Sequence, residues 1–176
     1  QTGHIIPLGK FVLQKALEHT AYWQRHFDKA FQIAVNLSPR QFRDTQLLSF
    51  ITQCLTSLKI TSSSLELEIT EGVLLSGHSY VDQALTGLNN QGIKMAMDDF
   101  GTGYSSLSYL RAYPFDVLKI DRSFINEVNQ AEKTKSLINA IISMSHALGL
   151  KVVAEGVETK KQLEQLKLFH CDYAQG

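Results

Sequence analysis

Hydrophobic and polar positions follow two patterns that alternate along the chain. In some segments apolar residues recur every three or four positions, which predicts amphipathic helices, and between them lie short apolar runs typical of buried strands. In the first helix the apolar positions are taken by Phe11, Val12, Ala16, Tyr22 and Trp23. The expected helices are 8–27, 39–58, 80–90, 105–113, 133–148 and 160–169. The expected strands are 31–38, 65–70, 94–100, 116–121, 151–156 and 171–176.

Several helix ends carry recognisable signals. Ser38 is a candidate N-cap with Pro39 at the first helical position, and Gly92 and Gly149 follow the ends of two other helices. Strands that alternate with helices and are apolar throughout favour a parallel sheet covered by helices.

The order of these segments indicates the fold class. A closed barrel of eight such units needs about 250 residues, whereas this chain has 176, opens on a helix and ends on a strand. We therefore expect an α/β fold of the TIM type, with about six of the eight βα units of a (β/α)8 barrel. An open doubly wound sheet is the structural alternative.

Composition limits the classes of partner. Hydrophobic residues make up 44% and charged residues 19%, as in a soluble globular domain. Basic and acidic residues both number 17, so no overall charge favours a DNA or RNA duplex or a membrane surface. Cys54 and Cys171 match no metal or redox spacing, which indicates free thiols in a reducing compartment. With no apolar run long enough to cross a bilayer and no signal sequence, we expect a cytoplasmic domain, whose parent protein can still be anchored to a membrane.

Polar side chains close every expected strand. Because the carboxyl ends of parallel barrel strands lie on one face, where such barrels build their active sites, these side chains should gather there. Crowded carboxylates need cations among them, and oxygen ligands without Cys or His suit Mg²⁺ or Mn²⁺ rather than zinc. One charged residue at a strand end is ordinary, but six strands that all end this way favour a site. The residues concerned are Asn36, Glu68, Asp98, Asp99, Lys119, Asp121, Glu155 and Gln175.

The stretch KMAMDDFGTGYSS places two of these carboxylates side by side. Adjacent residues of a regular strand point to opposite faces, so we expect a sharp turn at Gly101 and Gly103 to let Asp98 and Asp99 point the same way. DFG also occurs in protein kinases, but their glycine loop and His-Arg-Asp loop are missing here. GTGYSS lacks the full pattern of a nucleotide-binding loop.

The motifs together resemble the EAL domain family, the cyclic di-GMP phosphodiesterases. They are VNLSPRQF, LELEITEGVL, MDDFGTGYSSLSYL, LKIDRSFI, VVAEGVET and CDYAQG, in family order and spacing over nearly the whole chain. The resemblance implies a (β/α)8 barrel that hydrolyses cyclic di-GMP to linear pGpG in bacterial second-messenger signalling, using two Mg²⁺ or Mn²⁺ ions. It also implies a homodimer and fusion to sensory or diguanylate cyclase domains.

The Glu-Ala-Leu motif that names the family, and the substrate-binding arginine after it, do not occur in this sequence. We therefore expect residues 1–176 to be a partial EAL domain that lacks N-terminal strands and the C-terminal end. On its own this fragment should be inactive and poorly folded, because open sheet edges and core residues would be exposed.

The resemblance also implies roles for single residues. Asn36, Glu68 and Asp98 would ligate one metal alongside the glutamate of the missing Glu-Ala-Leu motif, and Asp98, Asp99 and Glu155 would hold a second. Lys119, with Asp121 beside it, would orient the attacking water or stabilise charge on the phosphate, and Glu155 is also a general-base candidate. Gln175 would contact the water, Glu71 would anchor the loop after Asp99 and couple it to the dimer interface, and Ser38 and Gln41 are further candidates for ligand contact.

Two other functions are considered. A degenerate EAL domain binds cyclic di-GMP as a receptor without cleaving it, and such domains usually lose one or more of the acidic groups. None is lost in this stretch, which favours the enzyme. An unrelated magnesium-dependent barrel enzyme is the third alternative.

Overall fold

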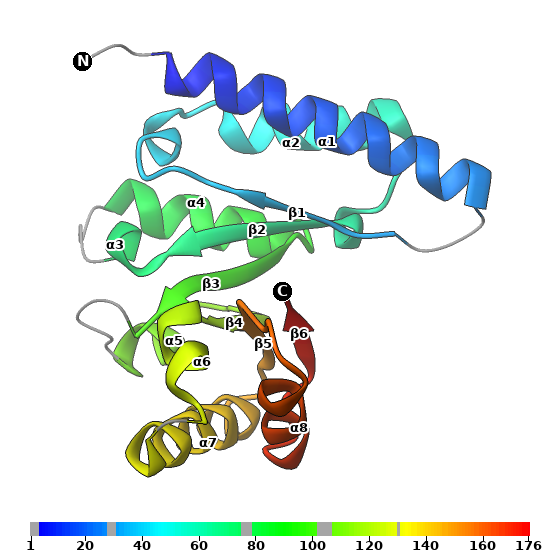
Figure 1. Ribbon diagram of the computed structural model, residues 1–176. Coiled ribbons are helices and arrows are strands. Elements are labelled where there is room, and N and C mark those ends of the chain that lie inside the picture. Colours follow the sequence, from blue (N-terminus) through cyan, green and yellow to red (C-terminus); the bar gives the residue numbers. More distant parts are fainter. Residues whose placement is uncertain (1–3, 28–30, 75–78, 102–106, 130) are drawn as a thin grey trace. The chain divides into compact units, whose positions relative to one another are not determined.

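The structure is a computed structural model that describes residues 4–27, 31–74, 79–101, 107–129 and 131–176. It divides into two units, Gln1–Met95 and Ala96–Gly176, and each is described by itself. Helices and strands alternate through both units, as the sequence predicts (Figure 1).

The first unit contains two parallel strands and the helices that pack on them. Strands β1 and β2 are paired so that Asn36, at the end of β1, lies opposite Glu68. Helix α1 packs along α2 (Figure 1). The elements are α1 (Ile5–Phe27), β1 (Ile33–Asn36), η1 (Gln41–Arg43), α2 (Leu47–Leu58), η2 (Ser62–Ser64), β2 (Leu65–Thr70), α3 (Glu71–Leu74) and α4 (Ser79–Asn90).

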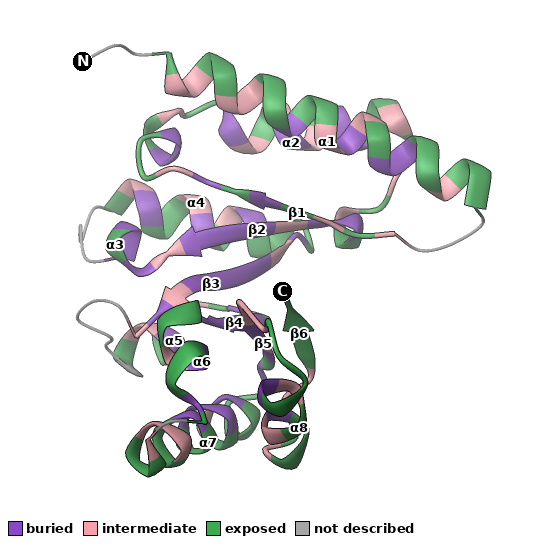
Figure 2. Ribbon diagram, viewed as in Figure 1, coloured by how far each residue is buried: buried purple, intermediate pink, exposed green. Residues whose placement is uncertain are grey.

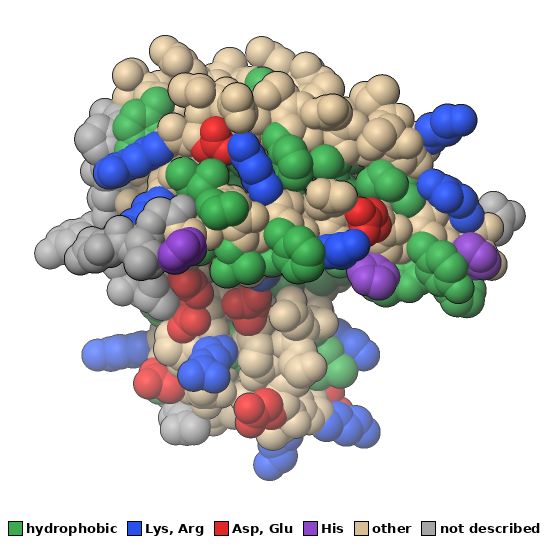
Figure 3. All heavy atoms as spheres, turned by 90° about the horizontal axis from the view of Figure 1, so that it is seen from above, with side chains coloured by type: hydrophobic (Ala, Val, Ile, Leu, Met, Phe, Trp, Pro, Cys, Tyr) green, Lys and Arg blue, Asp and Glu red, His purple; other side chains and the backbone are tan. Residues whose placement is uncertain are grey.

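Helix α1 has apolar residues on two sides, and the buried side is not the predicted one. The buried positions are Leu13, Leu17, Thr20 and Ala21, which follow helical spacing. Phe11 is 58% exposed, and Val12, Tyr22 and Trp23 are exposed with it. Figure 3 views the molecule from above, and hydrophobic side chains lie there among basic and histidine side chains. Periodicity identified the helix, but it could not decide between two apolar stripes.

The segment after β1 also differs from the prediction of one helix over 39–58. The backbone N–H of Gln41 donates to the carbonyl of Ser38 at 2.9 Å, which makes a tight turn into the short helix η1. Asp44 then accepts a hydrogen bond from the backbone N–H of Gln46 at 3.0 Å, and α2 begins at Leu47. A short acidic side chain that binds nearby backbone competes with helical hydrogen bonding. Pro39 is therefore not the first residue of an α-helix.

The second unit begins within β3, at Ala96, and contains three further strands, which are all parallel. β4 pairs with β3 and β5, and β5 pairs with β6. Strands β3 and β4 are largely buried and β5 is buried at alternate positions, whereas α7 and α8 expose their outer sides (Figure 2). The elements are β3 (Lys94–Phe100), α5 (Leu107–Ala112), β4 (Val117–Ile120), α6 (Arg122–Glu127), α7 (Glu132–Ala147), β5 (Lys151–Glu155), α8 (Lys160–Leu168) and β6 (Tyr173–Gln175).

Side-chain caps fix the helices that follow β4 and β5. The Asp121 carboxylate accepts the backbone N–H of Ser123 at the start of α6. Thr159 and Gln162 form a capping box at the start of α8, and Gln162 Nε2 donates to the carbonyl of Ile125 at 3.1 Å. The bond from Gln162 to Ile125 joins α8 to α6, so the segment between β5 and α8 is held by the capping box and by this bond.

The structure bears on the two cysteines and on the question of a membrane-spanning helix. Cys54 and Cys171 are both free thiols, as predicted. Burial raises the pKa of each thiol, which makes the reactive thiolate scarcer. Among the described residues, no helix combines the length and the hydropathy that a bilayer span requires.

Candidate active site

Asp98 and Asp99 share one side of the second unit because β3 is irregular where it ends. The β3–β4 register shifts between Met97 and Phe100, and Asp99 has a left-handed backbone with a φ of 55°. This bulge breaks the strict alternation of a strand. The sequence predicted a turn at Gly101 and Gly103 instead. Gly101 does turn, with a φ of 98°, but the irregularity already begins at Asp99, and Gly103 lies outside the described residues.

The two aspartates meet Glu155 from the end of β5. Asp98, Asp99 and Glu155 each offer a carboxylate oxygen, and these oxygens all lie within 4.8 Å of one another. The second unit thus brings together three of the predicted metal ligands.

Lys119 of β4 lies between two of these carboxylates. Its side-chain nitrogen is 2.6 Å from Glu155 Oε1 and 3.3 Å from Asp98 Oδ1, and the residue is only 4% exposed. The short strand β4 is buried along its whole length, which places the lysine inside the unit. One ammonium therefore partly balances the carboxylates and fixes the orientation of Glu155.

The charge and the donor atoms of this cluster fit a divalent cation. Three carboxylates and one ammonium leave a formal charge of −2. Asp98 Oδ1 is buried and, among the residues that the structure describes, accepts no hydrogen bond, although Lys119 is near. The Lys119 ammonium, 3.3 Å away, compensates this buried oxygen only in part, because the same ammonium lies closer to Glu155 at 2.6 Å. Ligands that are all oxygen suit hard ions such as Mg²⁺, Mn²⁺ or Ca²⁺.

Two further predicted residues flank the cluster. Gln175 of β6 lies opposite Glu155 in the β5–β6 register, and its carbonyl accepts the N–H of Val157 at 2.9 Å. Asp121 follows β4, and the hydrogen bonds from Ser123 hold the pKa of its carboxyl below the usual range. Its carboxylate caps α6, so the role predicted for it beside Lys119 stays a prediction.

The first unit contains the other predicted ligands. Asn36 Nδ2 donates to Glu68 Oε2 at 2.8 Å, and the backbone N–H of Leu37 donates to the Glu68 carbonyl at 2.9 Å. Since the amide donates through its nitrogen, its oxygen is the atom suited to ligate a cation. Glu71 is buried at the start of α3. The loop that it should anchor falls in residues 102–106, outside the described part of the chain.

Ser38 and Gln41 occupy the turn after β1. Gln41 is 4% exposed, and its Oε1 accepts the backbone N–H of Ser38 at 3.0 Å. Ser38 is half-buried. The Gln41 side chain is therefore engaged within the protein, and contact of these two residues with a ligand stays a prediction.

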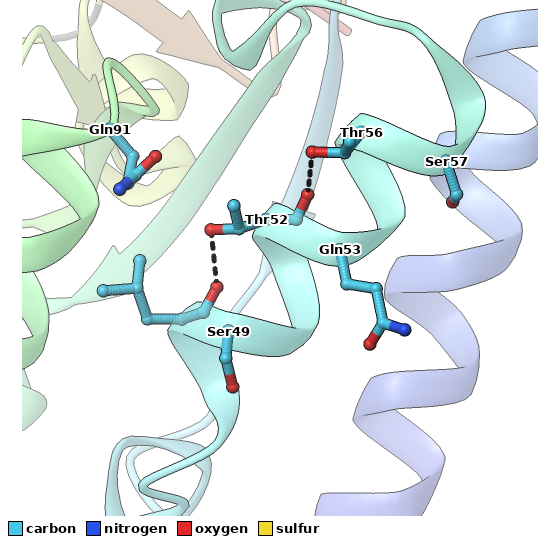
Figure 4. A pocket seen from close by; sticks show the side chains of 7 residues that line it. Ser49, Thr52, Gln53, Thr56, Ser57 and Gln91 are labelled. Carbon is cyan, nitrogen blue, oxygen red and sulfur yellow. Dashed lines mark hydrogen bonds between the residues drawn. The ribbon is translucent and has the colours of Figure 1, made fainter.

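A separate groove lies along α2 and contains none of the predicted site residues (Figure 4). Its volume is about 580 Å³, and it is lined by Leu48, Ser49, Thr52, Gln53, Thr56, Ser57 and Gln91. The hydroxyls of Thr52 and Thr56 donate to backbone carbonyls one turn earlier, at 2.9 and 2.8 Å. The described residues that line this groove are polar or apolar and carry no ionisable side chain.

Sequence reasoning missed the contacts that hold these segments. Gly9 of α1 faces the Gln41 side chain, and Lys10 pairs with Asp44 at 2.8 Å. A glycine inside a helical pattern is the signal that could have drawn attention to a close approach there. Thr159 and Gln162 have the spacing of a capping box, which could also have been read from the sequence.

Comparisons with known proteins show which family the chain resembles. The family described as "EAL domain" matches residues 1–176. The chain is 39% identical over 175 residues to the uncharacterized protein sll1895 of Synechocystis, covering 99% of this chain and 25% of that protein. It is 38% identical over 176 residues to the bifunctional diguanylate cyclase/cyclic di-GMP phosphodiesterase MucR of Pseudomonas aeruginosa, covering 100% of this chain and 26% of MucR. The chain thus spans about a quarter of these relatives.

A solved structure of the PaMucR phosphodiesterase in complex with c-di-GMP matches with a TM-score of 0.90 and 39% identity, over 99% of this chain and 70% of that one. The match confirms the predicted fold class, an α/β fold with the βα units of a TIM-type barrel.

Proposed function

The chain belongs to the EAL domain family, and from this we propose that its protein hydrolyses cyclic di-GMP to linear pGpG with two divalent cations, Mg²⁺ or Mn²⁺. The observation that carries the proposal is the cluster of Asp98, Asp99 and Glu155 around Lys119, which keeps the acidic groups that the resemblance places in this part of the chain. The c-di-GMP complex of the PaMucR phosphodiesterase supports the choice of ligand.

The ligand assignment follows the family resemblance. One ion is assigned to Asn36, Glu68 and Asp98, and the other to Asp98, Asp99 and Glu155. The formal charge of −2 on the second unit's cluster and the buried Asp98 oxygen support a cation there. The hydrogen bond between Asn36 and Glu68 supports a paired role for these two residues in the first unit.

The protein's own groups have distinct tasks in this proposal. When bound, the ions would make water more acidic and offset negative charge on the phosphoryl oxygens. Lys119, held by two carboxylates, presents a fixed positive charge to the charge that develops on the phosphate. Glu155, oriented by Lys119, has two alternative tasks, to ligate the second ion or to accept the proton of the attacking water. Gln175, opposite Glu155, contacts that water.

The test is hydrolysis by the full-length protein. We expect conversion of cyclic di-GMP to pGpG with Mg²⁺ or Mn²⁺, followed by chromatography and mass spectrometry, and loss of turnover with a chelator. Asp98→Ala and Glu155→Ala should abolish turnover, whereas Glu132→Gln on the exposed side of α7 should not change it. A protein that binds both ions and cyclic di-GMP but yields no pGpG would contradict the proposal.

A receptor that binds cyclic di-GMP without cleaving it is the second candidate. It predicts tight binding of cyclic di-GMP and no turnover in either metal. The presence of Asp98, Asp99 and Glu155 supports the enzyme, because degenerate domains usually lose one or more of these groups. Binding and turnover measured on the same sample separate the two functions.

The same family membership supports three proposals about the wider protein. We propose that residues 1–176 are part of one EAL domain, that the domain forms a homodimer, and that it acts in the cytoplasm. The name of MucR couples a phosphodiesterase with a diguanylate cyclase. A sensory or diguanylate cyclase domain in the same protein is proposed on that ground.

A further inference from the structure

We propose that Gly9 and Gln41 form a latch that positions Asn36. The latch joins helix α1 to the turn that follows β1, and all of its residues lie in the first unit. Its effect on catalysis rests on the proposed function, in which Asn36 is a metal ligand. Gln41 is then a positioning residue and not a contact of the substrate.

Gln41 hydrogen-bonds to Ser38 through both its side chain and its backbone. Its side-chain Oε1 accepts the N–H of Ser38 at 3.0 Å, and its own N–H donates to the carbonyl of Ser38 at 2.9 Å. The side chain is buried, so water does not compete for these bonds. The position of the Gln41 side chain therefore sets the position of Ser38.

Gly9 of α1 leaves room for the Gln41 amide because it has no side chain. A Cβ built on Gly9 would lie 2.6 Å from Gln41 Cδ and overlap Nε2. Real Cβ atoms essentially never approach a heavy atom closer than 3.0 Å, so an alanine would displace the Gln41 amide. Because this amide is the flexible end of its side chain, the cost lies in the hydrogen bond to Ser38 that it would lose. Lys10, the next residue of α1, pairs with Asp44 beyond the turn at 2.8 Å. The turn is thus joined to α1 by this ion pair and approaches α1 closely at Gly9.

The chain between Ser38 and Asn36 has little freedom to absorb a shift. Leu37 is buried, and its N–H donates to the Glu68 carbonyl at 2.9 Å. Asn36 itself donates to Glu68 Oε2 at 2.8 Å. A displaced Ser38 would therefore strain the Asn36–Glu68 pair, and errors of about 1 Å in a catalytic group can cost about a hundredfold in rate.

The experiment is a double-mutant cycle in the full-length protein with Gly9→Ala and Gln41→Ala. A matched control is Gly87→Ala, whose Cβ would meet Leu48 Cδ2 at 2.8 Å on α2, away from the turn. Four quantities are measured: hydrogen exchange of peptides covering residues 37–44, the Kd for Mn²⁺, and kcat and KM for cyclic di-GMP.

A latch predicts a specific pattern. Gly9→Ala should speed exchange in the turn, weaken Mn²⁺ binding several-fold and lower kcat by about tenfold, with KM changed by less than about twofold. Gln41→Ala should act in the same direction. In the Gln41→Ala background, Gly9→Ala should have no further effect, because the amide that it displaces is gone. Gly87→Ala should leave the turn and kcat unchanged.

Other results overturn the latch. If the effects of the two substitutions add, or if Gly9→Ala leaves exchange in the turn as in the wild type, Gly9 does not act through Gln41. A raised KM with unchanged kcat in Gln41→Ala would make Gln41 a substrate contact. A wild-type protein that fails to hydrolyse cyclic di-GMP refutes the proposed function, and the exchange measurements then still decide on the latch.

Discussion

Lys119 is the one cation that the described structure places among the clustered carboxylates. Its nitrogen contacts both Asp98 and Glu155, and these three side chains are largely buried. Removing one partner of a buried ion pair leaves an uncompensated charge, which costs more than an exposed pair ever contributes. The lysine therefore has a structural task in addition to the catalytic one proposed for it.

Lys119→Met should destabilise the protein by about 2–4 kcal/mol, because Asp98 and Glu155 would repel without the ammonium between them. Divalent cations should restore part of this loss, since they supply the missing positive charge. Urea unfolding with and without Mn²⁺ measures both effects. Lys135→Met is the control, because it removes an exposed ion pair on α7 and should cost less than about 1 kcal/mol in either condition. Equal stability of the two variants would contradict the assigned role.

Asp99 combines a carboxylate with a left-handed backbone, and substitutions can separate these properties. Asp99→Asn and Asp99→Gly keep a residue that tolerates a φ of 55°. Asp99→Val does not, and should cost about 1–3 kcal/mol of stability. All three should weaken Mn²⁺ binding, because each removes the charge.

Thermal unfolding ranks the stability of the three variants, and isothermal titration measures their affinity for Mn²⁺. We expect the Gly and Asn variants to unfold at a clearly higher temperature than the Val variant, while all three bind Mn²⁺ equally poorly. If valine were as stable as asparagine, the bulge at the end of β3 would not need this backbone.

Asp172 ties the end of α7 to β5 and to the start of β6. Its carboxylate contacts His146 at 2.8 Å, Lys151 at 2.7 Å and the backbone N–H of Val152 at 3.0 Å. Burial alone would raise the pKa of Asp172, but these hydrogen bonds outweigh it and lower the pKa from 3.8 to about 2. The folded protein therefore holds this carboxylate charged at a pH where the unfolded chain is already protonated.

The sign of the pH dependence follows from that lowered pKa. The stabilisation from Asp172 is fully present above pH 3.8, the ordinary value, and is lost as the pH falls toward about 2. Asp172→Asn should be less stable than the wild type by about 1–2 kcal/mol at neutral pH, and the difference should shrink below about pH 4. Urea unfolding of both proteins across this range measures it. A constant difference would show that the charge of Asp172 does not matter.

The sequence predicted the elements better than it predicted their contacts. Strands β2 to β6 and the alternation of strand and helix could be read from apolar runs and glycine signals, because those patterns are local. The residues at the strand ends were also predicted, and the structure clusters Asp98, Asp99 and Glu155 around Lys119. What could not be read depends on tertiary contact. The buried side of α1 is set by α2 and β1, and the left-handed backbone of Asp99 follows from the bulge against β4.

The turn after β1 shows the same limit. Ser38 and Pro39 are good local signals for a helix start, yet the chain forms a tight turn and η1 there. The buried Gln41 side chain and the Lys10–Asp44 pair hold that turn against α1. Nonlocal contacts override local propensity where they bury polar groups with their partners satisfied.

The proposed metal ligands come from both units of the chain, and this allows a test of the assignment. Asp98, Asp99 and Glu155 belong to Ala96–Gly176, whereas Asn36 and Glu68 belong to Gln1–Met95. A ligand that binds only the folded state slows the opening of every segment that it holds. If the assignment is right, Mn²⁺ should slow hydrogen exchange both at the ends of β3 and β5 and at the ends of β1 and β2.

Hydrogen exchange of the full-length protein with and without Mn²⁺ measures this protection by segment. Asn36→Ala removes one proposed ligand of the first unit and should confine the protection largely to the second unit. Thr61→Ala, at the exposed start of η2, is the control and should keep both regions protected. If Mn²⁺ protected only the second unit in the wild type, Asp98, Asp99 and Glu155 would bind the cation without Asn36 and Glu68. The two-ion assignment would then be wrong, although the acidic cluster would still be a metal site.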